Sequence, residues 1–431
     1  MSIVNRKQKP DIFEIAPDRK IVALITPQIY TLDNGIKVYV INAGVQDLVH
    51  VEFNFKAGIW YQKWPFIAMS ANNLMKEGTQ NMTARQIADE LDYYGAYHES
   101  SAEKDSAYQA LYTLNKYLPE TLKVMAEIIK RPLFDKKEVE IYLQKKYQGL
   151  LVQMEKVDYM ARIHFGELLY GAAHPYGKWA GPEEVRSVDR DRIATFHKKY
   201  YCSSNCYIII AGKVEDSAIS LLNKYFGGND WNGPEIKEEA FFDIQSAKGL
   251  NHHIEKPDAL QSALRIGKVL FNSSHPDFPG MHVLNTILGG YFGSRLMTNI
   301  REDKGLTYGI GSGLVSLKHS GYFYISSEVG SDVAEVAMDE ILKEIELLQK
   351  VPVGASELNL VRNYLGGTFL RAVDGPFSLA DRFKDIHEHN LGIDHYFRML
   401  DTVQNITPEE LMELANRYLN LDSLYRLKVG K

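Results

Sequence analysis

The sequence predicts an α+β fold built from two similar halves, and three observations indicate it. The chain has 431 residues, which exceeds the usual size of a single domain. Segments such as GYFYISSEV alternate apolar and polar residues, as strands do, and helical patterns occur among them without strict βαβ alternation. The third observation is an internal repeat. For each half, these features favour an antiparallel sheet with helices packed on one face.

The first half gives the clearest local signals. The stretch IYTLDNGIKVYVI alternates around Asn34-Gly35, a dipeptide typical of a hairpin turn. Thr83 and Gln86 form a capping box that begins a helix, and Gly95 ends it. Farther along we expect a strand near 105–113, a helix over about 119–130, and a longer helix beginning near 136.

An internal repeat relates the two halves. The stretch LKVMAEIIKRPLFDKKEVEIYLQKKYQG resembles LKEIELLQKVPVGASELNLVRNYLGG in the order and type of its residues. In each stretch an amphipathic helix ends at a proline, Pro132 or Pro352, and the next helix carries a glycine well along its length, Gly149 or Gly366. A repeat at about half the chain length indicates a duplicated domain.

The segment between the halves, GGNDWNGPEIKEEAFFDIQSAKG, is rich in glycine, charge and turn residues and is typical of a linker. We therefore expect an N-terminal domain over 1–228, a linker over 229–250 and a C-terminal domain over 251–431.

Composition and charge limit the kinds of partner and the cellular location that we expect. Apolar residues make up 45% and charged residues 24%, and the net charge of −6 gives no sign of a nucleic-acid partner. No apolar run is long enough to span a membrane, and the first residues lack the apolar core of a signal peptide. We expect a cytoplasmic protein, unless an export signal is missing from this N-terminus. Cys202 and Cys206 are expected to be ordinary structural thiols.

Several collinear segments carry a family resemblance: LDNGIKVYV, KEGTQNMTARQIADELDYYGA, HPYGKWAGPEE, YYCSSNCYIIIAGKV and LGGYFGSRLMTNIREDKGLTYGIGSG. They resemble the pitrilysin (insulinase) family of zinc metallopeptidases, in its branch of short two-domain subunits. The resemblance covers nearly the whole chain from about Tyr30. It implies two α+β domains that face each other like the halves of a clam.

The zinc motif of that family is missing. Active members carry H-x-x-E-H on a helix, where the two histidines share one face and bind zinc while the glutamate acts as general base. Met69 and Asn73 occupy the histidine positions here, and Asn72 occupies the glutamate position. The third ligand position falls near Gly149 or Leu150. Neither Met69 nor Asn73 is a plausible zinc ligand, and Asn72 cannot take a proton. The resemblance therefore implies neither a metal ion nor another cofactor in this chain.

A second part of the family's active site is present. Family members use an arginine and a tyrosine from the opposite domain, in a motif R-E-x-x-G-L-x-Y that matches Arg301 and Tyr308. Donors aimed at the tetrahedral oxyanion of peptide hydrolysis supply several kcal/mol. Gly305 should break the helix and let the two side chains converge. The plainer interpretation is that Arg301 caps the helix and Tyr308 packs in a sheet.

The resemblance implies a non-catalytic subunit of a heterodimeric peptidase. A homologous partner would carry H-x-x-E-H and the zinc ion, this chain would supply Arg301 and Tyr308, and peptide substrates would add to a sheet edge. The alternative is a catalytically inactive structural or binding protein, like the core subunits of respiratory complex III. A third hypothesis, zinc bound through unrelated ligands, also stays open.

Three groups of histidines are further candidates for a ligand set. His387 and His389, with His395 nearby, are i and i+2 on a helix and face apart, so we expect a solvated helix end. His164 with Glu167 is expected on a buried helix face, and the adjacent pair 252–253 on opposite faces of a strand.

Overall fold

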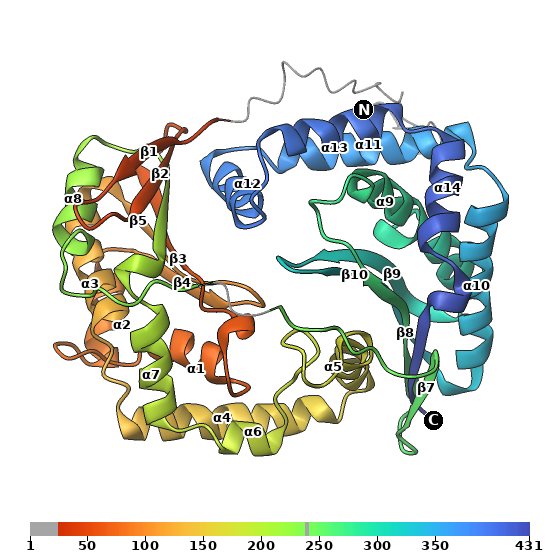
Figure 1. Ribbon diagram of the computed structural model, residues 1–431, viewed down its shortest axis with the longest axis horizontal. Helices are drawn as coiled ribbons and strands as arrows, with labels where there is room; N and C mark the ends of the chain where they lie inside the picture. Colours follow the sequence, from red (N-terminus) through yellow and green to blue (C-terminus); the bar gives the residue numbers. More distant parts are fainter. Residues whose placement is uncertain (1–24, 238–240) are drawn as a thin grey trace, which may run out of the picture.

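Two sheets organise the protein (Figure 1), and the computed structural model describes residues 25–237 and 241–431. The first sheet has the order β1-β2-β6-β3-β5-β4 and the second β7-β11-β8-β10-β9. The strands of the first sheet are β1 (Gln28–Thr31), β2 (Lys37–Asn42), β3 (Leu48–Phe55), β4 (Tyr97–Ala102), β5 (Ala107–Leu114) and β6 (Cys206–Gly212). Those of the second are β7 (Asn251–Glu255), β8 (Gln261–Leu270), β9 (Thr307–Ser316), β10 (Gly321–Gly330) and β11 (Tyr425–Gly430).

The two sheets share one topology. Without β1, the order β2-β6-β3-β5-β4 of the first sheet repeats as β7-β11-β8-β10-β9 in the second. In each, the strand that comes last in the chain lies between the first two, parallel to one and antiparallel to the other. The structure thus confirms the two-sheet α+β fold. The expectation of purely antiparallel sheets is wrong for these two pairs, because the last strand returns in the direction of the first. The domain limits given above stay a prediction.

Helices cover both sheets. Those between β3 and β6 are α1 (Ile67–Leu74), α2 (Ala84–Tyr93), α3 (Leu118–Lys130), α4 (Lys136–Met154), α5 (Val157–Tyr170), α6 (Pro182–Arg186) and α7 (Arg190–Tyr200), and α8 (Ser217–Phe226) follows β6. The later ones are α9 (Phe278–Asn285), α10 (Ala334–Lys350), α11 (Ala355–Arg371), α12 (Pro376–Glu388), α13 (Asp394–Asn405) and α14 (Pro408–Tyr418). Two π-helical segments, η4 (Thr286–Gly290) and η5 (Met297–Asp303), precede β9. Short 3-10 turns complete the described part.

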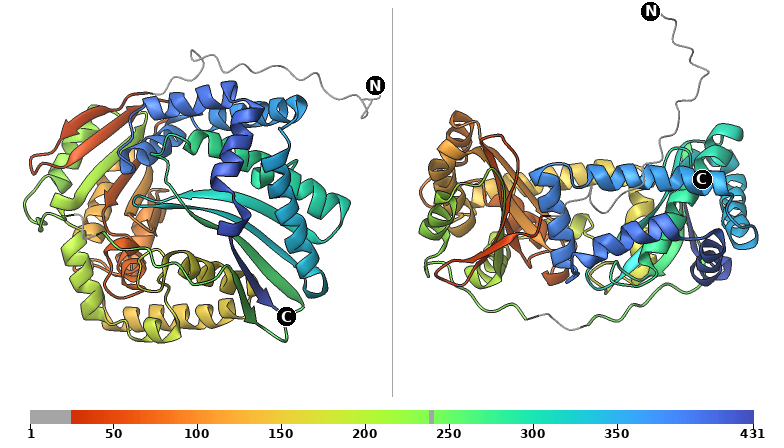
Figure 2. Two further views of the ribbon diagram at one scale, coloured as in Figure 1. Left: turned by 45° about the vertical axis from the view of Figure 1, so that its right-hand side comes forward. Right: turned by 90° about the horizontal axis from the view of Figure 1, so that it is seen from above.

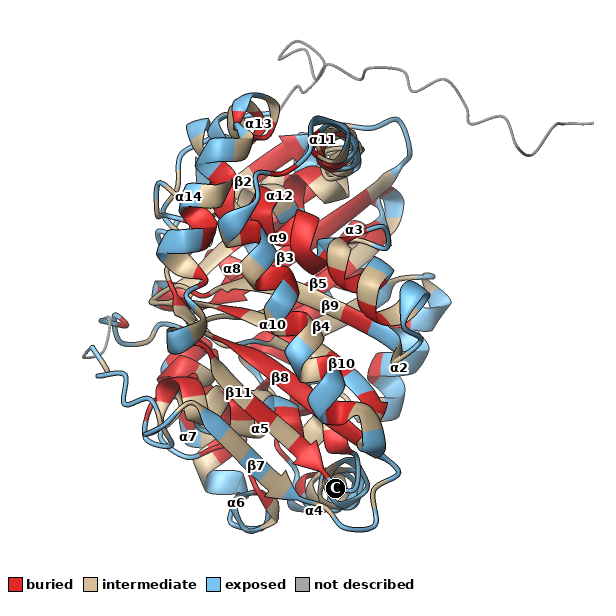
Figure 3. Ribbon diagram, turned by 90° about the vertical axis from the view of Figure 1, so that its right-hand side faces the viewer, coloured by how far each residue is buried: buried red, intermediate tan, exposed pale blue. Residues whose placement is uncertain are grey.

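Burial alternates along β10, whereas the central strands β3, β6 and β8 are buried along most of their length (Figure 3). On β10, Phe323 and Ile325 are buried in the core beneath α10 and its neighbours, whereas Tyr322 and Tyr324 on the opposite face are half-buried. A period of two is what a sheet with two differently covered faces requires. The more open face is called the inner face of each sheet below.

Each half sends one helix to the inner face of the other half's sheet. The long helices α4 and α11 bridge the halves (Figure 2) and lead into α5 and α12. Helix α5 packs on β8 and β11, and α12 packs on β2 and β6. In Figure 1 both helices lie between the two sheets. The expectation of helices on one face only is therefore incomplete, because long bridging helices carry their successors across.

Several local predictions are confirmed. β1 and β2 form an antiparallel hairpin whose turn contains Gly35 at φ +92°, a conformation that favours glycine. Helix α2 begins after Thr83, which forms the predicted capping box with Gln86. The bounds of β5, α3 and α4 lie within about two residues of the predicted ones.

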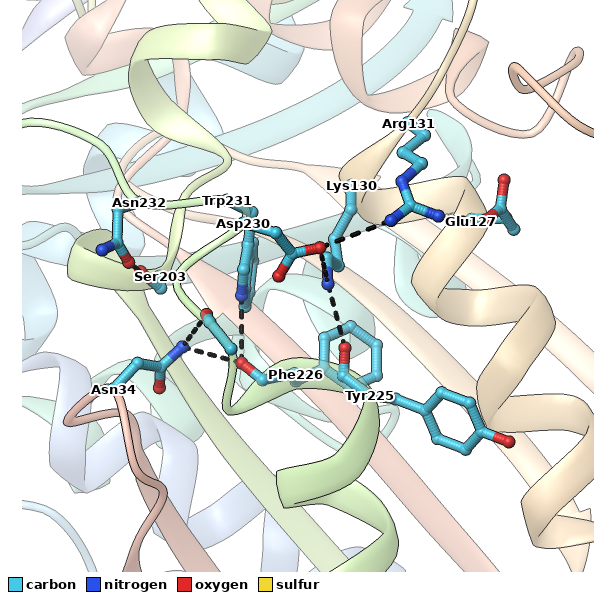
Figure 4. A network of polar contacts seen from close by, with 11 residues as sticks. Asn34, Glu127, Lys130, Arg131, Ser203, Tyr225, Phe226, Asp230, Trp231 and Asn232 are labelled. Atoms are coloured by element: carbon cyan, nitrogen blue, oxygen red, sulfur yellow. Dashed lines mark hydrogen bonds and ion pairs between the residues drawn. The ribbon is translucent and has the colours of Figure 1, made fainter.

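The segment expected to link the halves is anchored on the first half where it begins (Figure 4). Lys130 Nζ, at the end of α3, lies 2.5 Å from Asp230 Oδ2 and donates a hydrogen bond to the Tyr225 carbonyl at 3.1 Å. The Trp231 indole N–H donates to the Phe226 carbonyl at 3.0 Å. These contacts fix the chain as it leaves α8.

The same segment is anchored again near its end. Gln245 and Ala247 donate backbone hydrogen bonds to the carbonyls of Tyr170 and Leu168, at 3.1 and 2.9 Å. Those carbonyls belong to the last turn of α5, where a helix has no N–H donors of its own for its carbonyl groups. The segment therefore caps α5, the helix that crosses to the second sheet.

Candidate functional site

Helix α1 holds the three positions where the resemblance would place the zinc motif. Asn72 is 1% exposed, and its Oδ1 accepts hydrogen bonds from Gln109 Nε2 at 2.8 Å and from the Tyr201 hydroxyl at 2.9 Å. Its Nδ2 approaches the Tyr108 carbonyl at 3.5 Å. The amide at the base position is thus a satisfied structural group within the core.

The neighbouring positions are equally unsuited to zinc. Asn73 donates to the Tyr142 hydroxyl of α4 at 3.1 Å, and burial raises the pKa of that tyrosine. Met69 is half-buried and Gly149 is exposed. In residues 25–237 and 241–431, no group of three or more His, Cys, Asp or Glu side chains is placed to hold a metal ion. The donors at this position do not fit zinc, which takes histidine, cysteine or carboxylate ligands.

The polar contacts of Asn72 continue into the first sheet. His98 Nε2 on β4 lies 2.7 Å from Gln109 Oε1, and burial lowers the pKa of this histidine. A neutral ring that donates to Gln109 fits the chain of bonds from β4 through β5 to α1. Sequence reasoning missed these partners because they lie on separate elements.

The histidine sets do not behave as one site. His164 Nδ1 lies 3.3 Å from Glu167, and His253 Nε2 lies 3.2 Å from the Gly430 carbonyl. The ring of His387 packs against those of Tyr39 and Tyr207, with centroids 4.8 and 4.7 Å away. The expectation of a solvated helix end at His387 is wrong, because α12 lies against the first sheet.

Arg301 and Tyr308 are brought together at the other candidate site. Arg301, in the π-helix η5, donates from Nε to the Tyr308 carbonyl at 3.1 Å. Its guanidinium carbon lies 4.9 Å from the centre of the Phe292 ring. The Tyr308 side chain, on β9, is 93% exposed, so it does not pack in the sheet. Arg301 does bind a carbonyl, as the plainer interpretation expected, but the tyrosine projects into solvent.

Tyr308 lies in a β-bulge. Ser327 of β10 pairs with Ile310 and Val329 pairs with Thr307, so Tyr308 and Gly309 together oppose the single residue between them on β10. Bulges and π-helical turns both concentrate beside functional sites, where they redirect side chains. Nothing in the sequence pattern signalled either irregularity.

A cavity of about 440 Å³ adjoins this pair. Its walls include Arg301, Tyr308 and the carboxylates of Glu302 and Glu328. Burial, followed by the nearby Asp158, raises the pKa of Glu328. The cavity thus offers one fixed guanidinium, one exposed phenol and acidic walls, a surface suited to a polar chain such as a peptide backbone.

The two candidate regions lie apart. The turn after β9 touches the first half where Lys318 N donates to Asp105 Oδ2 at 3.0 Å. At about 3.3 Å per residue, Tyr308 is roughly 25–30 Å from that contact, whereas Gln109, beside Asn72, is within about 13 Å of it. Tyr308 is therefore at least roughly 12 Å from Gln109, whose side chain donates to Asn72 of α1.

Two family models match the sequence. One, described as Insulinase (Peptidase family M16), matches residues 67–165, and the other, described as Peptidase M16 inactive domain, matches residues 187–365. Together the matched stretches span more than half of the chain. The protein belongs to the insulinase (M16) peptidase family. The first match begins at α1, where the zinc motif is absent, and the second contains Arg301 and Tyr308.

Relatives of this M16 protein carry differing descriptions. It is 24% identical over 358 residues to the "Uncharacterized zinc protease YmxG" of Bacillus subtilis, covering 82% of this chain and 86% of the relative. It is 22% identical to the "Non-peptidase homolog YmxG" of Helicobacter pylori, over 63% of each chain. A crystal structure described as a peptidase M16 inactive domain from Pseudomonas fluorescens shares the fold, with a TM-score of 0.85, 23% identity, and 94% and 98% of the two chains covered.

Membrane insertion through a helix has no support in the structure: within the described ranges, no helix is both long and apolar enough to cross a bilayer.

Proposed function

We propose that this chain is the zinc-less subunit of a heterodimeric M16 peptidase and that it supplies Arg301 and Tyr308 to the active site of a homologous, zinc-bearing partner. The exposed position of this pair, away from the α1 helix of the same chain, is the observation that carries the proposal. The hydroxyl of an exposed tyrosine is open to a group of another molecule.

The chemistry follows from what the two side chains can donate. In peptide hydrolysis, negative charge develops on the carbonyl oxygen, and fixed donors stabilise it. Arg301 donates its Nε–H to the Tyr308 carbonyl, which orients the guanidinium. Its Nη1 lies 3.8 Å from Glu302 Oε1, so a substrate would compete with this ion pair for the terminal N–H groups. The phenol of Tyr308 adds one further donor. The partner would provide zinc and the general base.

Substrate would bind as an extended peptide. β4 and β9 each end a sheet, so each has one edge without a neighbouring strand. A peptide that pairs with such an edge is held through main-chain hydrogen bonds, so recognition tolerates many side-chain sequences. β9 carries Tyr308 at its start, which would place the donors beside a peptide on that edge.

The test is to mix the chain with the zinc-bearing M16 subunit of its own organism and to assay a set of internally quenched peptides. We expect activity from the mixture and from neither protein alone. Arg301→Ala should lower kcat by about 10²–10³-fold, because it removes a principal oxyanion donor. Tyr308→Phe should lower kcat without changing co-elution of the subunits. Full activity in both variants would refute the proposal.

One observation favours a second candidate, an inactive structural or binding protein. The Helicobacter pylori relative is described as a non-peptidase homologue, and the Asn72 side chain of α1 is buried and hydrogen-bonded within the core. Under this candidate no partner restores peptidase activity, although a stable complex with another protein still forms. The same mixing experiment separates the two.

A further inference from the structure

The helices that cross between the halves are each bound by an ion pair. Lys384 of α12 lies with Nζ 2.9 Å from Glu52 Oε1 on β3 of the first sheet, and the two side chains are 13% and 7% exposed. Arg265 of β8 in the second sheet pairs with Asp158 of α5, where the arginine side chain is 11% exposed and the aspartate side chain 45%. One helix therefore brings a cation to the first sheet and the other brings an anion to the second.

Glu52 and Arg265 occupy the same position of the repeated sheet. The last strand of each half ends in a glycine, Gly212 of β6 or Gly430 of β11. Three residues before that glycine, Ile209 pairs with Glu52 and Leu427 pairs with Arg265. The duplicated fold thus carries opposite charges at one equivalent site.

The surroundings of the two sites are also equivalent. Tyr108 pairs with the residue two positions after Glu52, and Tyr324 pairs with the residue two positions after Arg265. Lys384 Nζ lies 3.9 Å from the centre of the Tyr108 ring, and the Arg265 guanidinium lies 5.9 Å from that of Tyr324. In both sheets the cation lies near the tyrosine at the equivalent position. In the first sheet the cation comes from the helix, and in the second it comes from the sheet.

If each crossing helix packed on the sheet of its own half, like charges would come together. If α12 lay on the sheet of its own half at the equivalent place, Lys384 would face Arg265. If α5 did so, Asp158 would face Glu52. Like charges at a poorly solvated contact are strongly unfavourable, so both alternatives are penalised.

The first sheet adds to this selection. Near Glu52, the Tyr108 hydroxyl donates to Glu99 of β4 at 2.8 Å, and the Tyr207 hydroxyl of β6 donates at 3.3 Å to Glu388, an acid that α12 itself contributes. The contact is rich in acids, and Lys384 is the lysine that α12 places among them. A helix bearing Asp158 in its place would add another acid.

We propose that the opposite charges at this repeated position assign each crossing helix to the sheet of the other half and so hold the two halves in a single arrangement. A duplicated chain needs such a device, because it contains two sheets of one topology and two helices that follow equivalent bridging helices. Apolar packing alone distinguishes them weakly, whereas charge of opposite sign distinguishes them by both attraction and repulsion.

The first experiment is a cycle of charge reversals on the full chain, with Glu52→Lys, Lys384→Glu and the two combined. Each single variant should raise the equilibrium constant for unfolding in urea at least tenfold and speed hydrogen exchange across α12, because it leaves an uncompensated buried charge. The combined variant should regain most of the lost stability and most of the protection of α12. Effects that simply add, with no recovery, would overturn the proposal.

A second set separates assignment from simple stabilisation. The double variant Glu52→Arg with Arg265→Glu reverses both sheets and leaves the helices unchanged, so α5 and α12 should leave the sheets that they now cover. Spin labels on α12 and β6, and on α5 and β8, should therefore move apart, and adding Lys384→Glu and Asp158→Arg should restore the parent distances. Parent distances that persist in the double variant would contradict the assignment.

Two controls distinguish the expected effect from a general effect of charge reversal or from insolubility. Lys350→Glu breaks an exposed pair with Glu346 on α10, where the side chains are 68% and 44% exposed, and should change the unfolding constant less than about threefold. Where a reversed variant is insoluble, Glu52→Gln, Lys384→Met and their combination form the same cycle at smaller amplitude. An absence of coupling in that neutral cycle would also overturn the proposal.

Discussion

The two copies of the repeated fold treat the same region differently. In the first half, α2 is a regular helix and β4 pairs with β5 in unbroken register from Tyr97 to Ala102. In the second half, the matching region contains the π-helix η5 and a bulge in β9. Asn72, on the helix before the regular region, is buried, whereas Tyr308, within the irregular region, is 93% exposed. In the second half the irregular geometry therefore coincides with an exposed tyrosine.

The sharpest way to break this comparison is to remove the amide at the centre of the first copy. Asn72→Ala leaves Gln109 Nε2 and the Tyr201 hydroxyl without their shared acceptor in the core. We expect a loss of about 2–4 kcal/mol in the free energy of unfolding, since buried polar groups that lose a partner cost about 1–3 kcal/mol each. Chemical denaturation followed by circular dichroism measures it.

The matched control is Asn73→Ala. Asn73 makes one hydrogen bond, to Tyr142, at a half-buried position, and the variant should cost about 1 kcal/mol. Equal losses in the two variants would show that the α1 position is no more integrated into the core than its neighbour.

Much of the fold could be predicted from the sequence because it depends on local chemistry. The capping box of Thr83 and Gln86, the turn at Gly35 and the breaks at Pro132 and Pro352 each act over a few residues. The duplication was visible for the same reason, since each copy repeats these local signals. The absence of zinc ligands at α1 followed from the family resemblance.

Features that depend on distant partners could not be predicted. His387 was expected at a solvated helix end because residues i and i+2 face apart on a helix, yet α12 lies on strands more than 150 residues earlier in the chain. The bulge at Tyr308 depends on how β9 pairs with β10, and pairing register is not written in one strand alone. The sequence motif located Arg301 and Tyr308, but their exposure required the fold.

A smaller effect tests the contact of α12 with the first sheet. Burial raises the pKa of Glu388 at this contact. A carboxyl whose folded pKa is raised stabilises the fold most at low pH, and that contribution is lost as pH rises through the folded value. Relative to the parent protein, Glu388→Gln should therefore raise the free energy of unfolding by about 1 kcal/mol or less at pH 7 and by almost nothing at pH 4.

Unfolding free energies of both proteins between pH 4 and pH 7 measure this difference. Glu140→Gln, at an exposed position on α4, serves as the control and should track the parent protein at every pH. A Glu388→Gln variant that is less stable than the parent at pH 7 would mean that the ionised carboxylate is well accommodated and that burial does not raise its pKa.

The smallest expected effect is the most informative about the second copy. Tyr308→Ala should change the free energy of unfolding by less than about 0.5 kcal/mol, because the side chain is 93% exposed. Tyr97→Ala, in the regular strand of the first copy, should cost more, since its ring lies 6.0 Å from that of Tyr112 across the strand pair. If Tyr308→Ala proves as destabilising as Tyr97→Ala, the tyrosine is packed and the two copies differ less than their geometry indicates. If it is neutral for stability and yet lowers activity in the mixture with the zinc-bearing subunit, the effect must arise where Tyr308 meets another molecule.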